Sequence, residues 1–306
     1  MKRWLLVLVS FTLVVLGAEV AVREASGVLP DPAPWPTNES EVKAAQMGAG
    51  GPYDVVLLGT SVTESAVDAA MVSSALGVEV YDAALPYATQ QSLLVWMNDF
   101  VVPEARPSLI VLGIPSWGSG LEPPSDDDLL LDGLLKVEEF RHPRDPVTRL
   151  FRHSYLVRYR TELKELANLL EPRNQLLRNG SWTSRGNQTG YDGRTFDGTG
   201  LQFETATPGE VSTVGRLVAS ARENGSDIAF LFEPSNCDPG GLCVTPEGAD
   251  KNQQPYLELA REMAVPVIDL PGPWPLSWHA DPAHFNEEGT VNYTRLVIEK
   301  LRGLLP

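Results

Sequence analysis

The sequence predicts an α/β protein, with a central parallel β-sheet covered by helices on both faces in the flavodoxin-like, three-layer α/β/α arrangement. Two observations lead to this prediction. Short runs rich in Val, Ile and Leu alternate with segments of helical spacing, and these runs are apolar almost throughout. Strands that are buried on both faces of a sheet require such runs. The order of the segments favours an open sheet, whose ligands bind at the carboxyl edge of the strands.

The individual elements follow from these patterns. The predicted strands are Asp54–Leu58, Val78–Tyr81, Ser108–Leu112, Asp227–Phe232 and Val265–Leu270. The predicted helices are Val62–Ala75, Gln91–Val101, Val211–Glu223, Gln254–Met263 and Val291–Leu304. Together they predict one domain over residues 53–306, with an insertion or lid at about 118–208, where the alternation is lost. A surface loop is the alternative interpretation of that segment.

The composition restricts the class of partner. The chain has 306 residues with 43% hydrophobic content, which is enough for a sizeable core. Its formal net charge is −16 and its sequence pI is about 4.7. Because binding to phosphates needs clustered Lys and Arg, this charge argues against a nucleic-acid partner. The sequence indicates no oligomeric state.

The N-terminal segment predicts export. Lys2 and Arg3 precede an apolar run that starts at Trp4 and continues, interrupted by Glu19, to Val22. Its length suits a transmembrane helix, and the leading positive charges place the remaining chain outside the cell membrane. Residues 1–23 are thus a membrane anchor or, alternatively, a signal peptide whose cleavage gives a secreted protein. Residues 24–52, rich in Pro and Gly, are predicted as a linker.

The two cysteines agree with export. Cys237 and Cys243 are separated by a turn-rich spacer, which allows a small disulfide loop outside the cytoplasm. The alternative is a pair of free buried thiols. Because two cysteines alone do not complete a zinc site, we expect no metal and no cofactor.

A candidate nucleophile lies where the first strand ends. The segment DVVLLGTSVTE places Ser61 at a tight turn between a buried strand and a helix. This is where several families of α/β enzymes place a nucleophilic serine, since the turn exposes the hydroxyl. The same letters also form a capping box, in which Ser61 and Glu64 satisfy the helix end and have no catalytic role.

A candidate base lies near the C-terminus. In the loop Asp281-Pro282-Ala283-His284-Phe285-Asn286, an aspartate precedes a histidine by three residues, and Asn286 is a plausible cap for the last helix. This spacing allows the carboxylate to bind Nδ1 of the imidazole, which leaves Nε2 as a general base. A serine hydroxyl needs such a base. Both loops belong to the carboxyl edge of the predicted sheet.

Four stretches together resemble the SGNH/GDSL hydrolase superfamily, in particular an exported, membrane-anchored branch. They are Gly59-Thr60-Ser61, the segment Tyr81–Pro86, the segment Leu109–Gly113, and the block Asp281–Asn286. The resemblance extends over about residues 53–304 and implies an SGNH hydrolase fold. It also implies a catalytic triad of Ser61, Asp281 and His284.

The same resemblance implies an oxyanion hole formed by the N–H groups of Ser61 and Tyr87, with Ser116 where the family has an asparagine. The family glycine is replaced at Tyr87, so the two supporting blocks depart from the family pattern. Removal of one oxyanion donor typically lowers the rate by about 10²–10³.

The resulting hypothesis is a serine esterase or O-acyltransferase that acts through an acyl-enzyme on an ester of a cell-envelope or extracellular glycan or lipid. Trp117 and Trp278 are candidate substrate-binding residues, although core packing is the more common fate of tryptophan. The alternative hypothesis is a catalytically weak SGNH-fold module that binds acylated envelope polymers or partner proteins.

Overall fold

The computed structural model describes residues 2–25, 39–86, 88–114, 154–158, 206–234, 246–270, 274–280 and 284–305. Contacts within the chain divide it into two compact units. One comprises Met1–Val42 and Asp132–Arg173, and the other comprises Lys43–Leu131 and Asn174–Pro306.

The smaller unit contains helix α1 (Lys2–Ala25) and the short helix α8 (Tyr155–Arg158). The Glu19 carboxylate accepts hydrogen bonds from the Ser154 hydroxyl at 2.8 Å and from the Leu156 N–H at 3.0 Å, together with one from the Tyr155 N–H. The first N–H groups of a helix have no intrahelical acceptor. Glu19 therefore supplies the acceptors that α8 needs at its start.

The predicted membrane anchor coincides with α1. Among the described residues, no helix combines the length and the apolarity needed to cross a membrane. The role of residues 1–23 as an anchor or signal peptide stays a prediction.

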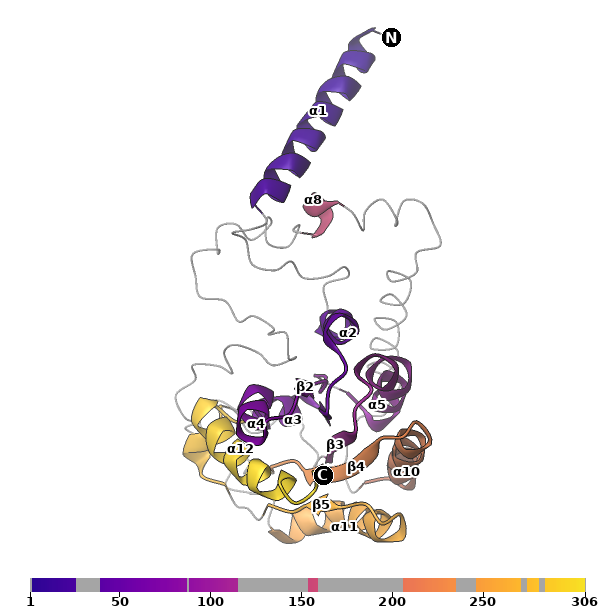
Figure 1. The fold of residues 1–306 in the computed structure, drawn as a ribbon, viewed down its shortest axis with the longest axis vertical. Coiled ribbons are helices and arrows are strands. Elements are labelled where there is room, and N and C mark those ends of the chain that lie inside the picture. Colours follow the sequence, from indigo (N-terminus) through magenta and orange to yellow (C-terminus); the bar gives the residue numbers. More distant parts are fainter. Residues whose placement is uncertain are drawn as a thin grey trace. The chain divides into compact units, whose positions relative to one another are not determined.

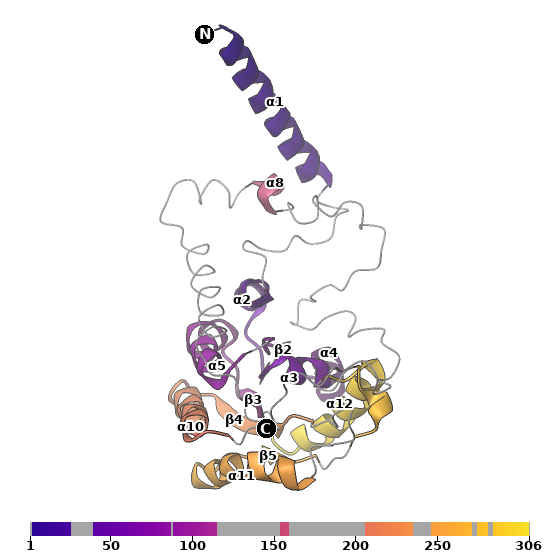
Figure 2. The same cartoon turned by 180° about the vertical axis from the view of Figure 1, so that it is seen from behind.

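The larger unit is built on a five-stranded parallel sheet with the order β2-β1-β3-β4-β5 (Figures 1 and 2). Every neighbouring pair of strands is parallel. The strands are β1 (Val55–Leu58), β2 (Val80–Asp82), β3 (Leu109–Ile114), β4 (Asp227–Phe232) and β5 (Val267–Ile268). This order is that of the flavodoxin type, so the predicted α/β fold is confirmed.

Helices cover both faces of the sheet. One face carries α3 (Ser61–Ala66), α4 (Ala69–Leu76) and α12 (Glu287–Leu301), and α12 contacts the other two (Figures 1 and 2). The other face carries α5 (Gln90–Trp96), η1 (Met97–Ala105), α10 (Pro208–Glu223) and α11 (Pro246–Glu262). A single turn, η3 (Leu276–Trp278), precedes α12. The layers match those predicted from the alternation of strands and helices.

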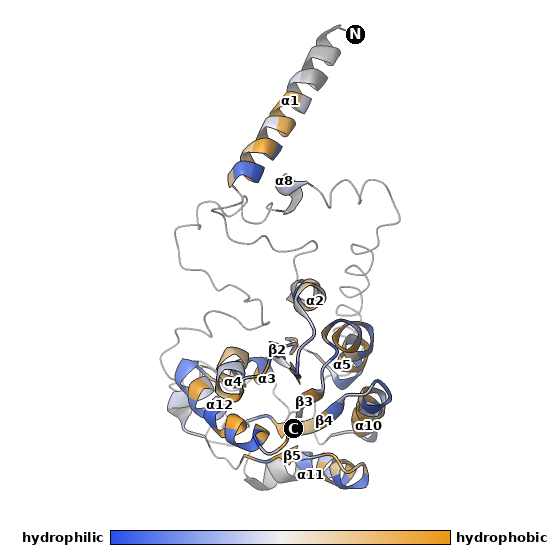
Figure 3. Cartoon of the chain, viewed as in Figure 1, coloured by the Kyte–Doolittle hydropathy of each residue, from blue (hydrophilic) through white to orange (hydrophobic). Residues whose placement is uncertain are grey.

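The core on the α12 side follows from the alternation of side chains along each strand. Val55 and Leu57 of β1 are fully buried there and belong to one cluster with Tyr293 and Val297 of α12. Helix α12 shows both hydrophobic and hydrophilic residues, as expected for a helix with one face on a sheet (Figure 3). This packing places the start of α12 next to the strand ends.

The first predicted helix is interrupted. Residues 62–75 were predicted as one helix, but the structure has α3 and α4 with a break at Val67 and Asp68. The Asp68 side chain accepts a hydrogen bond from the Met71 N–H at 3.0 Å and so caps α4. The Asp68 N–H donates to the Thr294 hydroxyl of α12 at 2.9 Å. Hydrogen bonds of the Asp68 backbone and side chain therefore stabilise the break between the two helices.

Part of the predicted linker is helical. Helix α2 (Glu39–Gly50) lies within residues 24–52, and the glycines expected to break any helix there do not do so before Gly50. Lys43, Ala44 and Met47 are fully buried. Glycine disfavours a helix by only about 1 kcal/mol per residue, and tertiary burial of this kind exceeds that.

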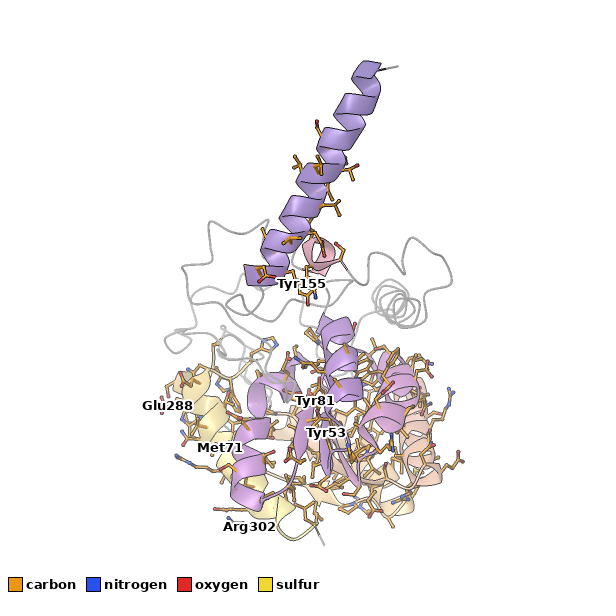
Figure 4. The ribbon with its side chains drawn as sticks, turned by 45° about the horizontal axis from the view of Figure 1, so that its top comes forward. Tyr53, Met71, Tyr81, Tyr155, Glu288 and Arg302 are labelled. Atoms are coloured by element: carbon orange, nitrogen blue, oxygen red, sulfur yellow. The ribbon has the colours of Figure 1, made fainter. Side chains whose placement is uncertain are left out.

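Two tyrosines lie against this helix. Tyr53 and Tyr81 are in ring contact at 4.9 Å (Figure 4). The Tyr81 hydroxyl donates a hydrogen bond to the backbone carbonyl of Lys43 at 2.9 Å. Because Tyr81 belongs to β2, this contact ties α2 to the edge of the sheet.

The ammonium group of Lys43 lies in the interior. It donates to Glu64 Oε1 of α3 at 2.8 Å and to the backbone carbonyl of Ala84 at 2.6 Å, and it is 3.9 Å from Asp82 Oδ1. The side chains of Lys43 and Asp82 are completely buried, and that of Glu64 is 11% exposed. A buried cation is stable only with such partners.

We expect replacement of Lys43 by methionine to lower the free energy of unfolding by about 3–5 kcal/mol, because the carboxylates of Glu64 and Asp82 would stay buried without this cation. Urea denaturation of the purified protein measures the change. Lys300→Met, at an exposed position of α12, is the matched control and should change the free energy of unfolding by less than about 0.5 kcal/mol. Equal effects of the two substitutions would contradict the assigned role of Lys43.

Candidate active site

Ser61 occupies the turn that follows β1, as predicted. The strand ends at Leu58, and Gly59 and Thr60 lead directly into α3, whose first residue is Ser61. The capping residue of this helix is Thr60, whose hydroxyl accepts a hydrogen bond from the Val62 N–H at 3.1 Å. The alternative interpretation, in which Ser61 and Glu64 form a capping box, is therefore wrong. Glu64 binds Lys43 instead.

His284 belongs to the segment that precedes α12, and several backbone contacts hold this segment in place. The Asn286 side chain accepts a hydrogen bond from the Gly289 N–H at 3.0 Å, so Asn286 caps α12 as predicted. The Asn286 N–H donates to the Trp278 carbonyl at 2.8 Å, and the Ala280 N–H donates to the His284 carbonyl at 2.9 Å. These contacts lie beside the antiparallel bridge between His279 and Phe285, the residue after His284.

The structure brings the two predicted residues together. His284 Nε2 lies 2.9 Å from Ser61 Oγ, although 223 positions separate them in the sequence. Both side chains are partly exposed. This is the distance at which a neutral imidazole accepts the proton of a serine hydroxyl, and it is the geometry of an activated nucleophile.

The backbone N–H groups of the turn differ in whether they have a hydrogen-bond acceptor. The Thr60 and Thr63 N–H groups donate to Glu233, and the Val62 N–H donates to Thr60. Within the described residues, the Ser61 N–H has no acceptor. It therefore remains available at the start of α3 for a developing oxyanion.

The remaining predicted site residues divide into two groups. Trp278 is described, and its ring stacks on Trp274 at 5.8 Å and meets the edge of Phe285 at 6.3 Å. These contacts account for Trp278 by packing, and its substrate-binding role stays a prediction. The other predicted residues lie outside the described part of the chain: Asp281, Tyr87, Ser116, Trp117, Cys237 and Cys243.

A buried carboxylate that the sequence analysis did not predict lies beneath the turn. Glu233, directly after β4, accepts hydrogen bonds from the Thr63 N–H at 3.1 Å and from the Thr60 hydroxyl at 3.0 Å. The Thr63 hydroxyl also donates to it in a short hydrogen bond. The sequence feature that could have identified Glu233 is an acidic residue at the carboxyl end of an apolar strand, because parallel sheets place functional groups there.

Burial raises the pKa of Glu233, and its hydrogen bonds from Thr63 and Thr60 act in the opposite direction. Only 2% of the residue is exposed. The same carboxylate acts on Tyr293, whose pKa is raised first by burial and then by the charges of Glu233 and Asp269. A negative charge at Glu233 is therefore disfavoured by burial and favoured by the donors of the turn.

Comparison with known proteins gives no family. No family model matches the chain, and none of the curated proteins matches its sequence. Among solved structures, a lipase/acylhydrolase from Enterococcus faecalis is similar, with 16% identity, coverage of 82% of this chain and 96% of that chain, and a TM-score of 0.41.

Two further solved structures are similar to a comparable degree. A catalytic mutant of an acetylxylan esterase from Geobacillus stearothermophilus has 10% identity, coverage of 82% and 95%, and a TM-score of 0.43. A GDSL-like lipase from Bacteroides thetaiotaomicron has 10% identity, coverage of 94% and 100%, and a TM-score of 0.41. At these identities and TM-scores the similarities assign no function.

The pKa of Glu233 predicts a dependence of stability on pH. Because the pKa is raised in the folded state above 4.5, the folded state binds more protons than the unfolded state at pH values above 4.5, and the free energy of unfolding falls as pH rises through that range. The variant Glu233→Gln lacks this carboxyl, so its free energy of unfolding lacks the pH-dependent contribution of Glu233.

We therefore expect the free energy of unfolding of Glu233→Gln, relative to the wild type, to increase as pH rises above about 4.5, by at most about 1.4 kcal/mol per pH unit. Urea denaturation at a series of pH values measures this difference. Glu288→Gln, which alters an exposed carboxyl of α12 (Figure 4), is the control. Parallel curves for wild type and Glu233→Gln would contradict the raised pKa.

Proposed function

We propose that the protein is a serine esterase that acts through an acyl-enzyme, with Ser61 as the nucleophile and His284 as the general base. The observation that carries this proposal is the 2.9 Å separation of Ser61 Oγ and His284 Nε2. Two features support it. Both side chains are partly exposed, and the turn that presents Ser61 lies at the carboxyl edge of a parallel sheet, where ligands of such sheets bind.

The proposed reaction has two steps. Ser61 Oγ attacks the ester carbonyl while His284 Nε2 takes its proton, and the same proton passes to the departing alcohol as the acyl group is transferred to Ser61. Water then attacks the acyl-enzyme, with His284 again as the base, and releases the acid. The Ser61 N–H is available to stabilise the oxyanion in both steps.

Three further assignments in this mechanism rest on the family resemblance of the sequence. Asp281 would orient His284 and stabilise its imidazolium form, since a separation of three residues allows the carboxylate to reach Nδ1 of the histidine. The Tyr87 N–H and the Ser116 side chain would complete the oxyanion hole. They are proposals for residues outside the described part of the chain.

The substrate and location are proposals from the sequence. We propose an ester of a cell-envelope or extracellular glycan or lipid as the substrate, because the charged and apolar pattern of residues 1–23 is that of an export signal or anchor. On an envelope glycan, a sugar hydroxyl would replace water as the acyl acceptor and make the protein an O-acyltransferase.

Labelling of Ser61 by a fluorophosphonate tests the nucleophile without knowledge of the substrate. We expect covalent labelling of the wild type, none of Ser61→Ala, and labelling of His284→Ala that is slower by about 10²–10⁴-fold, because the general base is lost. Mass spectrometry of the peptide that contains residue 61 measures the extent. Hydrolysis of a short-chain p-nitrophenyl ester should fall in the same order.

Ser65→Ala is the matched control, because Ser65 lies one turn later on α3 and its hydroxyl donates to the Val62 carbonyl at 3.0 Å. It should label like the wild type. Equal labelling of Ser61→Ala and the wild type would overturn the proposed nucleophile, and equal rates for His284→Ala and the wild type would overturn the proposed base.

A further inference from the structure

Glu233 is anchored to the sheet by its backbone. Its N–H donates to the Ile114 carbonyl at 2.8 Å, which continues the pairing of β3 and β4 beyond Phe232. The backbone position of Glu233 is therefore set by the strand pairing. A side chain that starts from such a position is better fixed than one on a free loop.

The side chain crosses a neighbouring strand to reach the turn. β1 and β4 are not adjacent, because β3 lies between them. Glycine at the end of β3 makes the crossing possible, since a Cβ on Gly113 would lie 2.9 Å from Glu233 Oε1 and would overlap the Thr63 hydroxyl. A Cβ on Gly59 would also overlap the Thr63 side chain. Two glycines thus leave space for the contact between Thr63 and Glu233.

The donors to Glu233 flank Ser61 on both sides. Thr60, directly before the serine, donates its N–H at 3.4 Å and its hydroxyl at 3.0 Å to Oε1. Thr63, two residues after the serine, donates its N–H at 3.1 Å and its hydroxyl to the same oxygen. One oxygen atom therefore fixes the backbone before and after the nucleophile.

A cap alone does not explain this arrangement. Helices α4, α5, α10 and α12 are capped by local side chains only, with Asp68, Thr89, Thr207 and Asn286 at the respective caps. Helix α3 has its own local cap in Thr60 and in addition receives a carboxylate from a position 170 residues away. Glutamate is rarely buried this completely. The additional acceptor goes to the short helix that begins with Ser61.

We propose that Glu233 is a positioning residue for the nucleophile: its Oε1 holds Thr60 and Thr63 so that Ser61 Oγ faces His284 Nε2 and the Ser61 N–H stays available. This inference rests on the proposed esterase function and adds to it the residue that orients the turn. The contribution comes from the acceptor oxygen and does not require a negative charge.

The substitution Glu233→Gln distinguishes the effect of the acceptor oxygen from the effect of the negative charge, because glutamine keeps an acceptor oxygen but carries no charge. Oε1 accepts the N–H groups of Thr60 and Thr63, whereas Oε2 contacts the Thr60 hydroxyl at 3.2 Å. A glutamine can therefore keep its carbonyl oxygen in the place of Oε1 and donate from its amide nitrogen to the Thr60 hydroxyl. Alanine removes both atoms and leaves the N–H groups of Thr60 and Thr63 without this acceptor.

The test compares rates of fluorophosphonate labelling at Ser61 in the full chain, with equal amounts of folded protein established by circular dichroism. We expect Glu233→Ala to label about 100-fold more slowly than the wild type, since a small displacement of a reacting group has an effect of this size. Glu233→Gln should stay within about tenfold of the wild type, because the hydrogen bonds persist with a neutral acceptor.

The control lies at the other end of the same strand. The Ser226 hydroxyl is buried and donates to the Pro107 carbonyl at 2.7 Å. Ser226→Ala removes a buried hydrogen bond next to β4 without contact to the turn, so it should label like the wild type. If Glu233→Ala does not fold, Thr63→Val serves as the second variant, because it keeps the side-chain shape and removes one donor to Glu233. We expect it to label about tenfold more slowly.

The outcomes separate the two proposals. If the wild type does not label at Ser61, the proposed function fails. If it labels and Glu233→Ala labels at the same rate, or Thr63→Val does so where Glu233→Ala is unfolded, the positioning role fails and the function stands. Glu233→Gln as slow as Glu233→Ala would overturn the assignment to the acceptor oxygen. Slow labelling of Ser226→Ala would show that the loss of any buried hydrogen bond next to β4 has the same effect. This result would also overturn the positioning role of Glu233.

Discussion

The parallel pairing of β1, β3 and β4 is the constraint on which the site depends. It brings the carboxyl ends of all three strands to one edge, so that the turn after β1, Gly113 near the end of β3 and Glu233 after β4 meet there. An antiparallel neighbour would place a strand start at that edge. The fourth component, the segment before α12, is added because that helix packs on the same face as α3 and α4.

Helix α3 shows how local weakness is compensated by tertiary contacts. Six residues are too few for a stable isolated helix. Two buried ionisable groups hold it instead, because Lys43 binds Glu64 and Glu233 binds Thr63. The Thr290 hydroxyl of α12 also donates to the Ser65 carbonyl at 2.5 Å. Ser61 is thus carried by a helix whose geometry is set largely by its neighbours.

Much of this arrangement was predictable from the sequence. Apolar runs identified the strands of the sheet, because β1, β2 and β3 are buried along their whole length and β4 at every residue but the first. Ser61 and His284 were found because the chemistry of an activated serine needs a base, and their loops belong to one sheet edge. Glu233 was missed since a single acidic residue after a strand has no distinctive spacing. Its role depends on the turn it contacts, which lies 170 residues away.

Other errors have a similar cause. Residues 39–50 were assigned to a linker from their glycines, but burial of Lys43 and Met47 against the sheet edge outweighs the local preference. The break between α3 and α4 has no proline or glycine to mark it, and it exists because Asp68 finds partners in Met71 and Thr294. The pattern of neighbouring residues in the sequence does not indicate contacts with residues that are distant in the sequence.

The distance in sequence between Ser61 and His284 has a consequence for folding. The pair closes a loop of 223 positions, one of the longest-range contacts that this chain can make, and contacts of that kind form late because chain entropy opposes them. An emerging chain that has been synthesised as far as β4 already contains the serine, its turn and Glu233, but it has no base. Under the proposed function, Ser61 therefore gains its base only when the segment before the last helix docks.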